Sequence, residues 1–249
     1  MKKTQRASFS YIIVFLLFSM IFIIIGYSVC AVWERIGKST ATYVEPSVYG
    51  SGVTVVLDPG HGGRDGGAVG VSSTYEKELN LEISLLLRDM LTASGINVVM
   101  TRTDDTMLSS GGGGTLKSQD LRARREIAQS IENAVFVSIH MNSFPIEKYN
   151  GLEVYYSVNN ESSKTIAENL RSSVIKELNT GGNRQIKPAG ENIYLLNELT
   201  CPAVLVECGF LSNPDDASRL NCPEYRQSLA LVMAVSLHKS ILEISAPSY

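Results

Sequence analysis

The sequence predicts an α/β fold: a single domain with a largely parallel, twisted sheet flanked by helices on both faces, preceded by an N-terminal membrane segment. Three observations lead to this prediction. Short β-branched runs alternate with longer amphipathic segments from Val53 onward, there are no internal repeats, and a long apolar stretch opens the chain. Alternating strands and helices favour a layered, mostly parallel sheet, whose strands are buried on both faces.

The membrane segment covers residues 1–33. No charged residue occurs in Ala7–Trp33, a stretch long enough to cross a bilayer core of about 30 Å, and Tyr11–Ile25 within it is almost entirely Ile, Phe, Leu and Val. The segment is either a cleaved signal peptide or an uncleaved signal anchor with the three basic residues before it in the cytoplasm. We favour the anchor, because the apolar stretch is longer than a typical signal region. Either way, the rest of the chain works on the far side of a membrane.

A linker and the first two elements follow. Residues 34–52 have no apolar periodicity and form the linker, while the folded domain covers 53–244 and a tail covers 245–249. Val53–Leu57 is a β-branched run that ends at an Asp-Pro-Gly turn, as expected of a buried strand. Lys77–Ala93 has apolar residues at spacings of three and four, which predicts a helix.

The remaining elements continue the alternation. A charged helix is expected over Ser118–Glu132, with Ser118 as its N-cap. Apolar runs predict the further strands, and apolar periodicity predicts the further helices. The expected strands are Ile96–Met100, Ala134–Ile139, Leu152–Tyr156, Ile193–Leu196 and Ala203–Val206, and the expected helices are Ser162–Leu178 and Pro223–Leu242.

Charge excludes one class of function. The chain of 249 residues has 22 Lys and Arg against 25 Asp and Glu. Three of these basic residues lie before Ala7, so the rest carries 19 basic against 25 acidic residues. A body with this balance and no basic stripe does not bind nucleic acid through a cationic surface, so no nucleic acid partner is expected.

Four polar residues lie where such a sheet places its ligand. His61 follows the first strand, His140 and Glu207 end two later strands, and Glu76 begins the first helix. Ligands bind outside the carboxyl ends of the strands in open α/β sheets. Two histidines and one carboxylate with an open fourth position are the ligand set of hydrolytic zinc. From the residues alone, Glu76 has a second explanation, since a Glu in the first turn of a helix usually complements the helix dipole.

Five ordered motifs carry a resemblance to a known family. They are D-P-G-H-G-G-x-D-x-G-A with Y-E-K downstream, T-R-x-x-D, S-I-H-x-N, G-L-E-V-Y-Y and P-A-V-L-V-E-x-G-F-x-S-N, spread between Val53 and about Ile241. In these motifs the chain resembles the zinc-dependent N-acetylmuramoyl-L-alanine amidases of type 3. The match covers essentially the whole folded body, and five motifs in order are a stronger signal than any one of them.

The resemblance implies a site and a reaction. His61, Glu76 and His140 would bind Zn²⁺, and Glu207 would be the catalytic carboxylate that cleaves the amide between the lactyl group of muramic acid and L-Ala of the peptidoglycan stem peptide. Three further polar residues are candidates for holding glycan or peptide, namely Asn142, Arg184 and Lys187. A role as solvated loop residues without function explains them at least as well. Two alternatives stay open, a zinc peptidase cutting within wall peptides and a non-catalytic, membrane-tethered wall-binding protein.

Within the family, the chain is most similar to the germination-specific cortex amidases of spore formers, which are short and carry an N-terminal membrane segment. This resemblance implies a role in spore cortex maturation, by muramic-lactam formation, and in germination. The expected location is extracytoplasmic, membrane-anchored or secreted, in the space between spore membrane and cortex. Because the surroundings of His61 are rich in glycine, we expect weak zinc retention and an activating protein partner at the same membrane surface.

Overall fold

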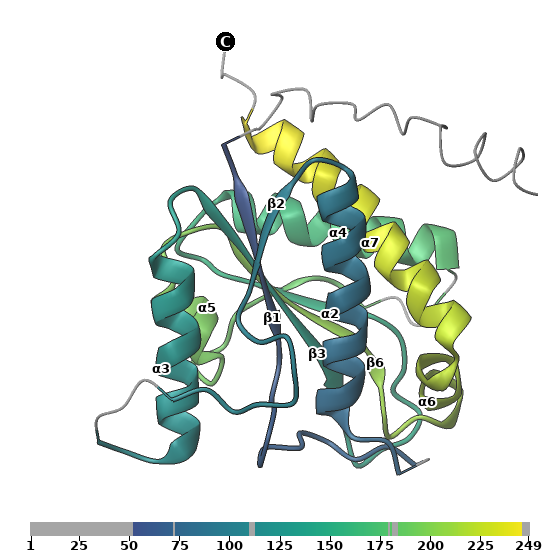
Figure 1. Ribbon diagram of the computed structural model, residues 1–249. Coiled ribbons are helices and arrows are strands. Elements are labelled where there is room, and N and C mark those ends of the chain that lie inside the picture. Colours follow the sequence, from purple (N-terminus) through teal and green to yellow (C-terminus); the bar gives the residue numbers. More distant parts are fainter. Residues whose placement is uncertain (1–51, 72, 110–112, 179, 181–183, 246–249) are drawn as a thin grey trace, which may run out of the picture. The chain divides into compact units, whose positions relative to one another are not determined.

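A six-stranded sheet with the strand order β2-β1-β3-β6-β4-β5 forms the centre of the computed structural model, which describes residues 52–71, 73–109, 113–178, 180 and 184–245 (Figure 1). Four adjacent strands, β2, β1, β3 and β6, are parallel, whereas β4 is antiparallel to β6 and β5 is parallel to β4. The prediction of a largely parallel sheet is therefore confirmed. The two strands at one edge, β4 and β5, run opposite to the other four. The strands are β1 (Thr54–Pro59), β2 (Asn97–Met100), β3 (Ala134–Asn142), β4 (Glu153–Tyr156), β5 (Lys187–Pro188) and β6 (Ala203–Phe210).

Helices cover both faces of this sheet, as predicted. One face is covered by α2 (Glu76–Ala93), α4 (Ser162–Leu178) and α7 (Pro223–Ser245), and α7 packs against both of the others. The other face is covered by α3 (Leu116–Gln129) and the short α5 (Tyr194–Glu198), and α6 (Pro214–Asn221) follows β6. In Figure 1, α2 and α7 lie in front of the sheet and α3 stands apart from them at its side.

The hydrophobic core consists of two clusters, one on each face of the sheet. Along β3, Val135, Val137 and Ile139 belong to the larger cluster under α2, α4 and α7, while Phe136 belongs to the smaller one with residues of α3 and α5. Successive side chains of a strand point to opposite faces. His140, four residues after Phe136, therefore lies on the face that carries α3 and α5, beyond the part that these short helices cover.

Several elements differ from the sequence prediction, among them strand β5, which was not predicted. Ile193–Leu196 was expected to be a strand, but the chain there forms α5, whose Leu195 and Leu196 are buried in the smaller cluster. Helix α3 begins at Leu116, because the side chain of Thr115, not Ser118, caps it by accepting a hydrogen bond from the Ser118 backbone N–H. Helix α6 was not predicted at all.

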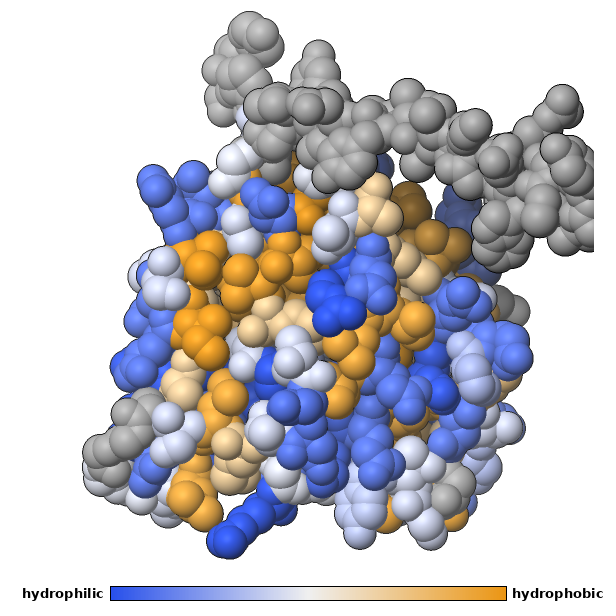
Figure 2. Space-filling model, in the orientation of Figure 1, coloured by the Kyte–Doolittle hydropathy of each residue, from blue (hydrophilic) through white to orange (hydrophobic). Residues whose placement is uncertain are grey.

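Among the described residues, α7 is long and apolar enough to cross a membrane by length and composition. It is a core helix of this domain, because Leu229, Met233 and Leu237 are buried between α2 and α4. Figure 2 shows apolar surface gathered over the edge strand β2, whose last three residues are half-buried. The predicted membrane segment (1–33), nearly all of the linker and the end of the tail lie outside the described residues.

Candidate metal centre and active site

Two buried arginines hold the loop that carries His61 by donating hydrogen bonds to its backbone carbonyl groups. Arg124 donates to the carbonyl oxygens of Pro59 and His61, at 2.8 and 2.6 Å, and Arg102 donates to those of Pro59 and Gly60, each at 2.9 Å. Both arginines are almost completely buried. His61 itself has a left-handed φ of 61°, which is unusual for a non-glycine residue. The arginines thus fix a backbone conformation that the chain would not adopt by itself.

Arg124 is in turn paired with two buried carboxylates. Its guanidinium lies 2.6 Å from Asp58 and 2.8 Å from Asp120. Asp58 also accepts hydrogen bonds of 2.7 Å from Thr101 and from Ser138. Burial alone would raise the pKa of Asp58, but the charge of Arg124 and these hydrogen bonds outweigh it and lower the pKa below its ordinary value. Asp58 and Arg124 are therefore both charged at neutral pH.

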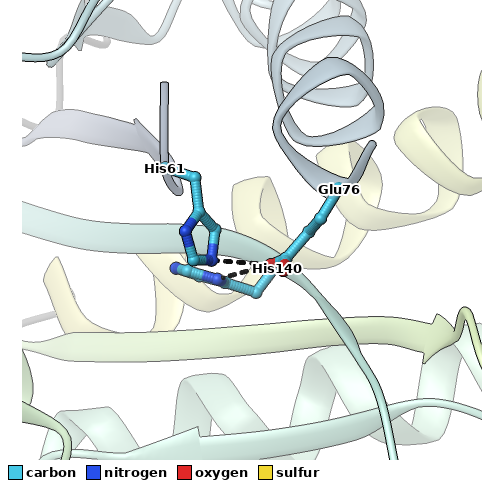
Figure 3. Close-up of side chains that lie close together, drawn as sticks. All are labelled: His61, Glu76 and His140. Carbon is cyan, nitrogen blue, oxygen red and sulfur yellow. Dashed lines mark hydrogen bonds and ion pairs between the residues drawn. The ribbon is translucent and has the colours of Figure 1, made fainter. Parts of the chain in front are cut away.

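His61, Glu76 and His140 meet at one point (Figure 3). Oε1 of Glu76 lies 3.1 Å from Nε2 of His61 and 2.9 Å from Nδ1 of His140. The two imidazole rings are 5.0 Å apart and nearly perpendicular. One ligand atom from each residue lies within 4.8 Å of the other two, a spacing at which all three can bind one metal ion.

Glu76 serves this cluster and does not cap its helix. It is the first residue of α2, its carboxylate is buried, and no side chain caps that helix end. Its two oxygens accept hydrogen bonds from the backbone N–H groups of Ala68 (2.8 Å) and Met141 (3.2 Å) and from the Asn80 side chain (3.3 Å). Burial opposes ionisation, but the hydrogen bonds from the two histidines lower the pKa of Glu76. The carboxylate is therefore ionised and aimed at the histidines.

Two glycines leave the room that this cluster needs. A Cβ atom at Gly60 would lie 2.2 Å from the ring of His140. At Gly67, where φ is +67°, a Cβ atom would lie 2.5 Å from Oε2 of Glu76 and 2.8 Å from Cδ2 of His61. Both glycines belong to the sequence motif around His61, and close packing against the cluster explains why a side chain does not fit there.

A second carboxylate orients His61. Nδ1 of His61 lies 2.9 Å from Oδ1 of Asp65, which also forms an ion pair with Lys117. Burial opposes the charge on Asp65, but the neighbouring Lys117 and His61 lower its pKa to about 2. A carboxylate behind a histidine is the usual outer partner of a metal-ligating imidazole. It holds the ring so that Nε2 faces the cluster.

Glu207 lies beside the cluster without belonging to it. On β6 it pairs in register with His140 of β3 and with Glu153 of β4. Its Oε2 is buried and has no hydrogen-bond partner among the described residues. Burial, followed by the charges of Glu76 and Glu153, raises the pKa of Glu207 well above its ordinary value. Leaving a buried carboxylate oxygen without a partner is costly, so this position is unusual among the described residues of the sheet.

The three candidate substrate residues converge on a carboxylate that the sequence prediction missed. Glu153 accepts hydrogen bonds from Asn142 (3.1 Å) and Arg184 (3.3 Å) and forms an ion pair with Lys187. The hydroxyl of Tyr155 donates to it at 3.1 Å. The only signal in the sequence was a Glu between Leu152 and Val154 at the start of a buried strand.

Comparison with known proteins identifies the family. Residues 55–239 match the family model described as N-acetylmuramoyl-L-alanine amidase. The chain belongs to this family. Over 195 residues it is 36% identical to the germination-specific N-acetylmuramoyl-L-alanine amidase of Bacillus subtilis, covering 77% of this chain and 79% of that protein.

Solved amidase structures agree with this assignment. The CwlD amidase of Clostridioides difficile, in complex with the GerS lipoprotein, superimposes with a TM-score of 0.71 at 35% identity, covering 77% of this chain and 98% of that one. The amidase AmiC2 of Nostoc punctiforme gives a TM-score of 0.68 at 33% identity, covering 78% and 99%. The chain is therefore an enzyme, an N-acetylmuramoyl-L-alanine amidase acting on peptidoglycan, and the resemblance seen in the sequence is confirmed.

Proposed function

We propose that this amidase is a zinc enzyme in which His61, Glu76 and His140 hold the metal and Glu207 is the catalytic acid and base. The observation that carries the proposal is the convergence of both imidazoles on one carboxylate oxygen of Glu76, at 2.9 and 3.1 Å. The donor set fits zinc, since two nitrogens and one oxygen leave a fourth position open for catalysis. The contact between His61 and Asp65 supplies the expected outer partner.

The surrounding residues suit hydrolysis of the lactyl–L-Ala amide. A metal at this position would polarise the amide carbonyl and make water a better nucleophile. Glu207, next to His140 in the sheet, takes the proton from the attacking water and delivers it to the departing alanine nitrogen. One positioned carboxyl can serve both steps.

Metal analysis of three histidine variants tests the metal site. His61→Ala and His140→Ala should each lose zinc, because two protein ligands form an inadequate site. His238→Ala is the matched control, because this third histidine lies on α7 outside the cluster. Elemental analysis should find zinc in the control and none in the other two. Unchanged zinc in both cluster variants would refute the ligand assignment.

We further propose that the substrate is spore cortex peptidoglycan, with roles in cortex maturation and germination. The support is the similarity to a relative named as germination-specific. Digesting purified cortex and vegetative peptidoglycan with the zinc-loaded protein tests this, with the products separated by mass. Released stem peptides that begin with L-Ala are expected from cortex. Shortened peptides still attached to sugar would point to a peptidase, and equal digestion of both materials would contradict a cortex role.

The location and the partner are proposals of the same kind. We infer that residues 1–33 hold the enzyme at a membrane, outside the cytoplasm, and that a second protein there raises its zinc affinity. The support is the apolar N-terminal sequence and the complex of CwlD with a lipoprotein. A partner that binds only the metal-loaded form strengthens metal binding by linkage. Full zinc retention through dialysis and full activity of the isolated protein would refute the need for a partner.

A further inference from the structure

We propose that Arg184 and Lys187 bind the free α-carboxylate of the second stem-peptide residue, and that Glu153 is a positioning residue that holds both cations in place. This inference rests on the proposed function, because it uses Glu207 as the group that protonates the leaving nitrogen. It goes beyond that function by assigning an anion subsite and the direction in which the peptide lies.

Strand register sets the direction. His140, Glu207 and Glu153 occupy facing positions on the neighbouring strands β3, β6 and β4. Facing residues of paired strands lie on the same face of a sheet. The row therefore runs from the metal cluster, past Glu207, to Glu153. Since the leaving nitrogen must lie next to the group that protonates it, the peptide beyond that nitrogen continues toward Glu153.

The length of the peptide matches this row. Neighbouring strands are about 4.8 Å apart, so two steps place Glu153 roughly 10 Å from His140, measured along the row. An extended chain advances about 3.3–3.6 Å per residue, so the second residue lies about 7 Å beyond the scissile bond. In peptidoglycan that residue is glutamate linked through its γ-carboxyl, which leaves an α-carboxylate free. Arg184 and Lys187, which contact Glu153, have side chains long enough to reach from there to this α-carboxylate.

Glu153 itself is occupied by the protein. Its side chain is 2% exposed. One of its oxygens accepts from Asn142 and Tyr155, and the other faces Arg184 and Lys187. Two cations around one carboxylate leave an excess of one positive charge. Glu153 therefore orients the cations, and it is not itself open to substrate.

Both cations keep donors for a further anion. The Lys187 side chain is 49% exposed and that of Arg184 is 23% exposed. Arg184 uses only Nη1 toward Glu153, and within the described part of the chain Nε and Nη2 have no acceptor. Its guanidinium lies 4.6 Å from the ring of Phe210 and 5.0 Å from that of Tyr149, which fixes its plane. An orientated guanidinium beside an ammonium group is suited to a carboxylate.

The experiment compares two soluble muramyl-peptide substrates that differ at one group, with the second residue carrying either the free α-carboxylate or its amide. The variants are Arg184→Gln and Lys187→Gln in the full chain. Lys148→Gln is the matched control, since Lys148 lies 5.6 Å from the same Tyr149 ring and makes no contact with Glu153. Each protein is assayed for kcat/KM with both substrates, and its zinc content is measured.

We expect the unmodified enzyme to prefer the carboxylate substrate by about tenfold or more. Each cation variant should lose about tenfold in kcat/KM on that substrate while its rate on the amide changes little, and the control should retain the preference. Equal losses on both substrates would show that the cations only neutralise Glu153, and would overturn the proposal. An unmodified enzyme that cleaves both substrates equally well would overturn it too.

One outcome separates this test from that of the proposed function. Cleavage of neither substrate by the unmodified, zinc-loaded enzyme would overturn the proposed function and this inference with it. If Arg184→Gln fails to fold, Lys187→Gln decides, because that side chain is half exposed. Calorimetry supplies a second measurement, in which the dipeptide L-Ala-D-Glu should bind the unmodified enzyme more tightly than its α-amide, and equal affinities would count against the subsite.

Discussion

Replacing Gly67 by Ala tests the proposed metal centre without touching a ligand. Gly67 has a φ of +67°, and an added Cβ atom would lie 2.5 Å from Oε2 and 2.8 Å from Cβ of Glu76. Neither Glu76 atom can retreat easily, because the residue is buried at the start of α2 and Oε2 is held by the Ala68 backbone. The added methyl group therefore displaces the carboxylate or the His61 ring.

The expected effect has two parts. Placing Ala in a left-handed conformation costs about 1–2 kcal/mol of stability. Moving a ligand away from its optimal position should also lower zinc affinity by at least the 10- to 100-fold typical of lost outer-shell contacts. Gly95→Ala is the matched control, because Gly95 has a φ of +84° and no atom lies within 4 Å of its added Cβ. The control should show only the loss of stability.

Two measurements separate these parts. Denaturant unfolding of the metal-free proteins gives the free energy of unfolding, which should fall by a similar backbone contribution in both variants. Competition with a chelating dye gives the zinc Kd, which should rise only in Gly67→Ala. If Gly67→Ala binds zinc as tightly as Gly95→Ala, the metal does not lie between His61 and Glu76.

Three further outcomes are expected. Glu207→Gln should keep its zinc while hydrolysis falls about 10²–10⁴-fold, and near-normal turnover would exclude Glu207 as the acid and base. Arg124→Met leaves Asp58 and Asp120 buried without their cation, so the free energy of unfolding at pH 7 should fall by about 3–5 kcal/mol, and a loss under about 1 kcal/mol would contradict the network. The lowered pKa of Asp58 contributes stability above its unfolded pKa of about 3.9, which is lost as the pH falls through the folded value. Between pH 6 and pH 2 the free energy of unfolding should therefore fall more steeply with decreasing pH for the unmodified protein than for Asp58→Asn. Equal pH dependence of the two proteins would contradict this contribution.

The sequence was informative wherever a local pattern decides the structure. The runs ending near His61, His140 and Glu207 are apolar on both faces, so their assignment as buried strands was secure. The shared edge of a parallel sheet then brought the two histidines together. The prediction of a strand over Ile193–Leu196 was wrong, because four apolar residues fit a strand and a buried helical turn equally well. Asn213 followed by Pro214 is a helix start that could have revealed α6.

Contacts between side chains on different strands could not be predicted from the sequence in the same way. Nothing in the spacing of Arg184 or Lys187 indicates that both lie against Glu153, because that contact depends on the order of β4, β5 and β6 in the sheet. The role of Glu76 was likewise open, since the first turn of a helix favours any carboxylate. In the structure the Glu76 side chain contacts both histidines, which supports the proposed ligand role.

The position of β6 has a consequence for how the protein is made. This strand is synthesised last of the six, yet it lies between β3 and β4 and joins them. A growing polypeptide that has passed His140 already contains all three proposed ligands, but it lacks Glu207 and cannot close its sheet. With Glu207 as the proposed acid and base, hydrolytic competence therefore requires that β6 has been synthesised and inserted into the sheet. A chain interrupted before β6 would lack the proposed acid and base and would leave peptidoglycan intact.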